Sequence, residues 1–79
     1  MAKKKVHLVF PQKLIKEPVI YTMAKKYDVI PNIRRAKITD KVGEVTLELC
    51  GTKEDLDKAR DYLEKAGIKV EPILGDIVE

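Results

Sequence analysis

The stretch that decides the fold is Gly43-Glu44-Val45-Thr46-Leu47-Glu48-Leu49-Cys50-Gly51. Its apolar residues Val45, Leu47 and Leu49 alternate with Glu44, Thr46, Glu48 and Cys50. A two-residue period is typical of a β-strand that has one buried and one outward face. The glycines at both ends are typical of turns. We therefore predict a strand over residues 44–50.

The chain after this strand predicts a helix and then another strand. Thr52 and Asp55 have the spacing of a capping box at a helix start, and apolar residues follow at helical spacing. Gly67 stands just past the expected end of this helix. Residues 68–73 predict a last strand, which Pro72 assigns to a sheet edge because proline cannot donate to a neighbouring strand.

The chain before residue 43 predicts the same order of elements. Residues 4–10 alternate as a strand, and a helix follows from Glu17-Pro18 to Asp28. Residues 33–39 predict a second strand, in which Arg34-Arg35 disturbs the alternation. This pattern favours an edge strand protected by charge, and it also permits a bulge near the two arginines.

Two β-α-β halves with right-handed crossovers place the first and third strands at the centre of one sheet and the other two at its edges. We predict an α+β fold, a ferredoxin-like βαββαβ sandwich with a four-stranded antiparallel sheet and both helices on one face. Residues 1–79 form one domain, with a basic, solvated start at 1–5 and a tail at 75–79 that frays or adds a short edge pairing. A domain this small favours a homodimer, because a second subunit can cover an exposed face.

Composition argues against several classes of partner. The net charge of +3 comes entirely from the run Lys3-Lys4-Lys5, which is typical of a solvated terminus. Strand 44–50 has no aromatic residue and two carboxylates, which argues against RNA binding on the sheet. Cys50 is the single cysteine, so no intramolecular disulfide, cluster or paired-thiol metal site is expected. With no signal peptide and no apolar run of about 20 residues, we expect a cytoplasmic protein without membrane insertion. We also expect no cofactor.

Most of the chain resembles the NIL domain, a family named for an Asn-Ile-Leu motif. The matching segments are Glu17-Pro18-Val19-Ile20, Tyr27-Asp28-Val29, Asn32-Ile33, Ala36-Lys37-Ile38 and the stretch from Gly43 to Gly51. The chain departs from the motif at Arg34, where the family favours Leu. This departure affects the packing or the surface around the motif.

The resemblance implies a function in ligand binding or regulation. NIL domains occur at the C-terminus of the ATPase subunits of methionine-import ABC transporters, where they bind methionine and inhibit transport. They also occur with iron–sulfur ferredoxin domains and as single-domain proteins. The resemblance implies a regulatory module for methionine or a related sulfur amino acid. The alternative is a protein-interaction module that serves a sulfur-metabolism or iron–sulfur partner without any small ligand.

Four residues are the candidate ligand-binding residues. Asn32 offers an amide donor and acceptor that suit an amino acid, and it also fits a turn residue after Pro31. Arg34, with Arg35 beside it, could clamp a carboxylate or simply keep an edge strand soluble. Ile33 and Ile38 fit core or interface contacts, and either also fits an apolar slot for a ligand side chain.

No residue pattern predicts catalysis, so we expect no enzymatic activity. His7 is the only histidine, and no nucleophile or acid stands beside it in sequence. Cys50 is expected to be an inert small residue. Glu44 and Glu48 lie on a solvated strand face rather than in a shared cleft, which acid–base chemistry would need.

Overall fold

The two predicted β-α-β halves are present in the computed structural model, which describes residues 2–73. The elements are β1 (Ala2–Phe10), a short 3-10 helix η1 (Gln12–Leu14), α1 (Val19–Tyr27), β2 (Ile30–Ile38), β3 (Gly43–Gly51), α2 (Lys53–Lys65) and β4 (Lys69–Pro72). The tail 75–79, with its predicted fraying or edge pairing, lies outside the described residues.

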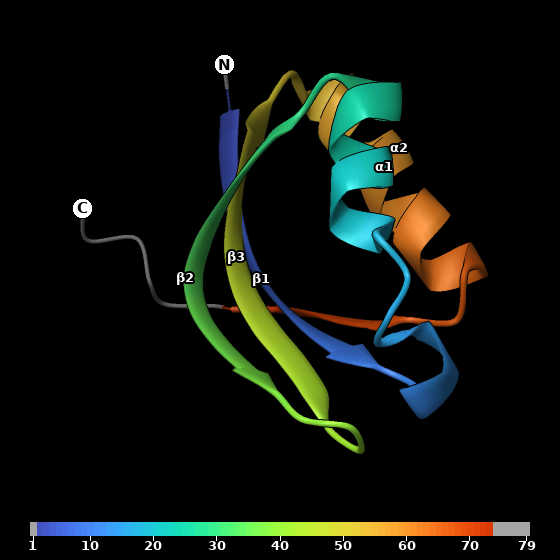
Figure 1. Cartoon of the computed structure of the whole chain (residues 1–79). Coiled ribbons are helices and arrows are strands. Elements are labelled where there is room, and N and C mark those ends of the chain that lie inside the picture. Colours follow the sequence, from blue (N-terminus) through green and yellow to red (C-terminus); the bar gives the residue numbers. More distant parts are fainter. Residues whose placement is uncertain (1, 74–79) are drawn as a thin grey trace.

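The sheet has the predicted topology. Its strand order is β2-β3-β1-β4 and every neighbouring pair is antiparallel. The two longest ladders join the central strands β1 and β3 to each other and β3 to β2, whereas β4 pairs with only four residues of β1. Both helices lie on one face of this curved sheet (Figure 1). The α+β ferredoxin-like fold is therefore confirmed.

The core lies between the two helices and the two central strands. Its buried side chains are Val6, Leu8, Val19, Met23, Val29, Val45, Leu47, Leu49, Leu56, Ala59, Leu63 and Ile68. The predicted inward residues of β3 are all among them. Because β3 is central, its buried residues have neighbours on both flanking strands and on the helices. None of the helices in residues 2–73 is long and apolar enough to cross a membrane.

Local signals fix both ends of α2. The Thr52 hydroxyl accepts a hydrogen bond from the Asp55 backbone N–H at 3.1 Å, as the capping-box spacing predicted. At the other end Gly67 has a φ of 102°, a conformation that side chains with a Cβ rarely adopt. The helix thus begins and ends at the residues that sequence chemistry selects.

Replacement of the Thr52 cap should weaken the domain measurably. We expect Thr52→Ala to lower the free energy of unfolding by about 1 kcal/mol, because one first-turn N–H of α2 loses its acceptor. Urea denaturation followed by circular dichroism measures this change. Thr22→Ala is the matched control, since Thr22 is exposed within α1 and caps nothing. An equal loss in both variants would contradict the assignment of the cap.

Three strands begin earlier than the sequence predicted, and β3 does so by one residue, at Gly43. β1 starts at Ala2 rather than residue 4, so Lys3 and Lys4 pair in register with Cys50 and Leu49 of β3. The physical reason is that β3 offers backbone partners as far as Gly51. β2 starts at Ile30 rather than residue 33, since an edge position tolerates the proline that follows.

The bulge that the sequence permits in β2 is present, whereas two strand ends move inward. The register between β2 and β3 shifts between Ile33 and Arg35. β2 ends at Ile38, and the Thr39 side chain instead accepts hydrogen bonds from the backbone of the turn that follows, including one of 2.9 Å from Val42. β4 covers Lys69–Pro72 within the predicted 68–73 and lies at a sheet edge, as Pro72 indicated.

Candidate functional site

The four predicted ligand-binding residues all lie on β2, but they do not converge. Asn32 pairs with Glu48 and so shares its outward face, away from the helices. Ile33 and Ile38 pair with Leu47 and Gly43, which places both on the face that carries the helices. Arg34 lies in the bulge between Ile33 and Arg35. Of these four residues, only Ile38 lines the apolar cavity described next.

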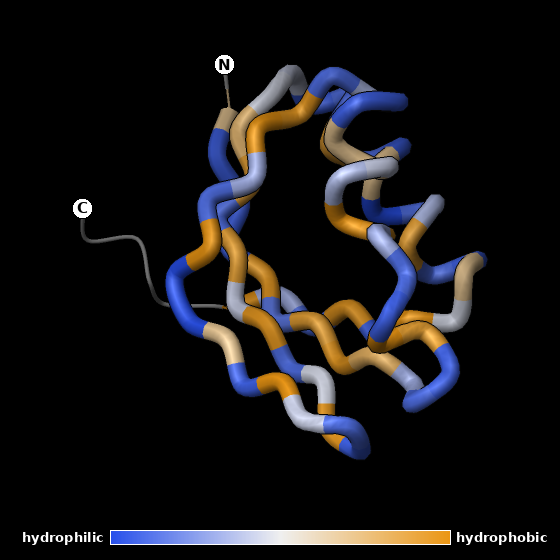
Figure 2. Tube along the Cα trace, viewed as in Figure 1, coloured by the Kyte–Doolittle hydropathy of each residue, from blue (hydrophilic) through white to orange (hydrophobic). Residues whose placement is uncertain are grey.

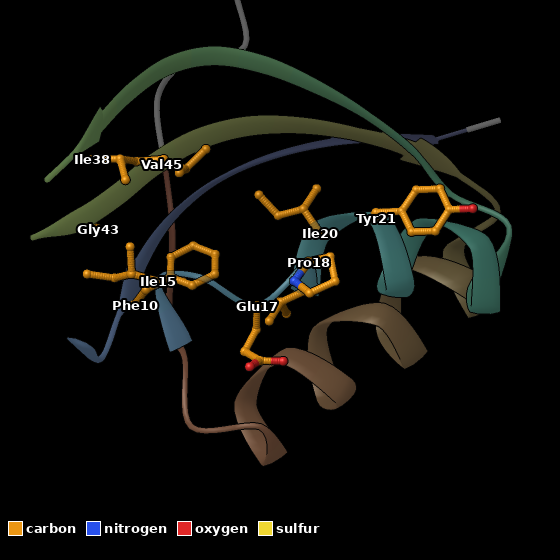
Figure 3. Close-up of a pocket in the computed structure, with 10 residues that line it drawn as sticks. Phe10, Ile15, Glu17, Pro18, Ile20, Tyr21, Ile38, Gly43 and Val45 are labelled. Carbon is orange, nitrogen blue, oxygen red and sulfur yellow. The ribbon is translucent and has the colours of Figure 1, made fainter. Parts of the chain in front are cut away.

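This apolar cavity lies between the start of α1 and the β2–β3 hairpin, with a volume of about 150 Å3. Its lining residues are Phe10, Ile15, Glu17, Pro18, Val19, Ile20, Tyr21, Ile38, Gly43 and Val45. In Figure 3, Ile20 extends from α1 toward the strands that carry Ile38 and Val45, whereas the Glu17 carboxylate points away from them. The cavity wall is therefore mostly hydrocarbon.

The connection from β1 to α1 shapes one end of the cavity. Phe10 ends β1, and η1 then turns the chain so that Ile15 folds back over the start of β3. A Cβ at Gly43 would stand 3.1 Å from both Ile15 Cγ1 and Phe10 Cβ. A side chain at residue 43 would therefore require Ile15 and Phe10 to shift by a few tenths of an ångström.

Backbone donors lie at the same place because α1 begins there. Pro18 is the N-cap, and no side chain caps the helix. The Val19 N–H donates to the Glu17 carbonyl at 2.8 Å, and the Thr22 N–H donates to the Pro18 carbonyl at 3.0 Å. Ile20 and Tyr21 lie between these two residues in the first turn of α1. Their N–H groups have no acceptor among the described residues. Such groups attract anions, because they carry the positive end of the helix dipole.

Together these features suit a small amphiphilic ligand. An apolar protein cavity of about 150 Å3 is large enough to bind benzene. The cavity would hold one apolar side chain, while a carboxylate could accept hydrogen bonds from the free N–H groups of α1. Most of the lining residues were missed as site residues, because apolar residues such as Ile15 in a connecting segment predict packing in general. The Glu17-Pro18 helix opening was the available signal.

A second hollow of about 400 Å3 lies on the outward face of the sheet and is polar. It is lined by His7, Arg35, Ala36, Lys37, Glu44 and Thr46. Both ring nitrogens of His7 have partners, with Nδ1 at 3.0 Å from Thr46 Oγ1 and Nε2 at 3.3 Å from Glu44 Oε1. Since its arginine and lysine are exposed to water, this hollow resembles the mostly apolar sites that bind small molecules less than the apolar cavity does.

The remaining reactive side chains form no metal centre in the described part of the chain. Residues 2–73 contain no group of three or more His, Cys, Asp or Glu that could hold a metal ion. Cys50 is half-buried and shares the outward face of β3 with Glu48 and Thr46. The apolar cavity is therefore the candidate functional site.

Comparisons with known proteins agree with this architecture. The C-terminal domain of an ABC transporter ATP-binding protein from Enterococcus faecalis is similar, with 26% identity and a TM-score of 0.81 over 92% of this chain and 86% of that one. An uncharacterized protein conserved in bacteria, from Eubacterium ventriosum, has 17% identity and a TM-score of 0.50 over 92% of this chain and all of that one, a likeness of fold alone.

The family of the chain follows from its own sequence. No curated protein matches it. The sequence profile of the NIL domain matches residues 4–72, which include every strand and helix from β1 to β4 except the first two residues of β1. Because this match covers most of the sequence, the chain belongs to the NIL domain family.

Proposed function

We propose that this NIL domain is a regulatory module that binds methionine or a related sulfur amino acid in the apolar cavity. The observation that carries the proposal is an apolar space of about 150 Å3 beside free N–H groups at the start of α1. One end of the site suits a hydrocarbon or thioether chain, and the other suits a carboxylate. The domain would bind its ligand without transforming it.

The lining residues favour a thioether over a plain hydrocarbon chain. Phe10 lines the cavity, and a sulfur atom near an aromatic ring gains roughly 0.3–1.5 kcal/mol. A thioether side chain is also flexible enough to adapt to an irregular wall. The similar domain from the Enterococcus faecalis ATP-binding protein supports a regulatory setting, since that domain is part of a transporter.

The ligand also suggests how regulation would work. The cavity wall combines α1 with the end of β2 and the start of β3, so a bound side chain would contact both layers of the domain. Occupancy would therefore fix the position of the β2–β3 hairpin relative to α1. A partner that contacts β2 would respond to that change.

We expect saturable binding of L-methionine when the purified domain is titrated in a calorimeter. Norleucine, which replaces the sulfur by a methylene, should bind up to about tenfold more weakly because the contact with Phe10 is lost. Methioninol, which lacks the carboxylate, should also bind more weakly because it cannot accept from the α1 amides. Homocysteine, cysteine and S-adenosylmethionine complete the series. No heat from any of them, with the domain shown to be folded, would refute the proposal.

The alternative function, a protein-interaction module, is favoured by a separate observation. Ile33 and Ile38 on β2 are more than half exposed although both lie on the helix-facing side of the sheet. A ligand in the cavity does not explain Ile33, which lies outside it.

A further inference from the structure

The free edge of β2 combines unpaired backbone groups with exposed isoleucines, which edge strands usually avoid. β2 pairs only with β3, so one of its edges has backbone groups without strand partners in residues 2–73. Toward the helices it presents Ile33 and Ile38, which are 57% and 59% exposed. A solvated edge strand needs no isoleucines on that side, whereas an edge that receives another strand gains from them. Figure 2 shows that hydrophobic and hydrophilic segments alternate along this strand.

The charge of β2 is of one sign. Arg34, Arg35 and Lys37 are exposed, and residues 30–38 contain no acidic residue. Lys37 pairs in register with Glu44, but the Glu44 carboxylate contacts His7 at 3.3 Å, and no ion pair joins β2 to another described residue. Arg35 faces the uncharged Thr46. The cations of β2 are therefore available to a partner.

These charges argue against a second copy of β2 as the occupant. A second β2 strand has no carboxylate to offer in any register, and some registers would place arginine opposite lysine. Like charges directly opposite each other destabilise a strand pair. An added strand with acidic residues at alternate positions would instead place carboxylates opposite the cations of β2.

The regular part of the edge defines the partner more closely. Pro31 and the bulge after Ile33 interrupt the first half of β2, which leaves Arg35–Ile38 as an uninterrupted stretch. There Arg35 and Lys37 share the outward face, and Ala36 and Ile38 share the helix-facing side. We propose that the β2 edge binds an extended peptide segment of a partner protein in which acidic and apolar residues alternate, as an added strand of the sheet. This inference goes beyond the ligand cavity and does not rest on it.

A titration with two designed peptides tests the proposal. The acidic probe is acetyl-Gly-Val-Glu-Val-Glu-Val-Gly-amide, and the basic probe has Lys in place of Glu. We expect the acidic probe to shift the amide resonances of β2 in the ¹⁵N-labelled domain and to slow their hydrogen exchange. The basic probe should do neither at the same concentration. Affinity should fall as salt is raised, because the charges are exposed.

Charge reversal adds a second readout. The double variant Arg35→Glu/Lys37→Glu should bind the acidic probe about tenfold or more weakly and should gain binding of the basic probe, since each cross-strand charge pair changes affinity by a factor of a few. Lys53→Glu/Lys65→Glu on α2 is the control with the same change in net charge, and it should bind as the unmodified domain does.

Three results would overturn the proposal. They are equal binding of both probes, equal weakening in the two double variants, and β2-mediated self-association that excludes the acidic probe. If the reversed variant does not fold, the comparison of the two probes on the unmodified domain decides the question alone. Failure of methionine to bind leaves this test unaffected, so the two proposals fail separately.

Discussion

Leu47→Ala is expected to lower the free energy of unfolding by about 3–5 kcal/mol, the largest effect of any single substitution considered for this domain. Leu47 is 0% exposed on the central strand β3, where it pairs with Val6 of β1 and Ile33 of β2. Its truncation removes buried methyl groups and leaves a cavity that the surrounding strands cannot close. A domain of this size has a total stability of only about 4–12 kcal/mol, so the variant should be partly unfolded in mild urea.

Ile33→Ala is the matched control, because Ile33 lies directly opposite Leu47 and is 57% exposed. It should change the free energy of unfolding by less than about 1 kcal/mol in the same urea titrations. A loss as large as that of Leu47→Ala, increasing with protein concentration, would show that a second copy covers β2. This comparison therefore also tests the homodimer that the small size of the domain predicts.

The fold was predictable where one local signal decided each element. The alternation over Gly43–Gly51 established a half-buried strand, and Thr52 with Gly67 marked both ends of α2. The crossovers then allowed one strand order. The sequence failed at the starts of β1 and β2, because lysines and a proline argue locally against a strand. Long-range pairing with β3, which no local pattern contains, decided both starts.

The candidate site was less predictable than the fold. Ile38 was selected by its place in the NIL motif, and it does line the cavity. Phe10, Ile15 and Ile20 come from three different segments, and their convergence depends on how η1 turns the chain against Gly43. A local pattern cannot show that turn. Asn32 was chosen for its chemistry, but the face on which it lies depends on the register of β2 with β3.

Ile20→Phe is expected to weaken methionine binding at least tenfold while the domain stays folded. Ile20 is half-buried on the first turn of α1 and extends toward the strands on the other side of the cavity (Figure 3). A phenyl ring at this residue would occupy a space that is only about 150 Å3. Isoleucine and phenylalanine have similar helix propensities, so α1 itself should be little affected. Calorimetric titration gives the affinity, and a thermal melt confirms folding.

Two further variants locate the ligand. Ile33→Phe makes the same chemical change outside the cavity and should leave methionine affinity unchanged. Asn32→Ala removes the amide that the family motif suggests as a ligand contact, and Asn32 lies on the outward face of β2. If Asn32→Ala abolishes binding and Ile20→Phe does not, methionine binds on the outward face and the cavity is only a packing defect. If Ile20→Phe abolishes binding alone, the cavity holds the ligand. Loss in both would mean that Asn32 acts on the cavity through β2, whose last residue, Ile38, forms part of its wall.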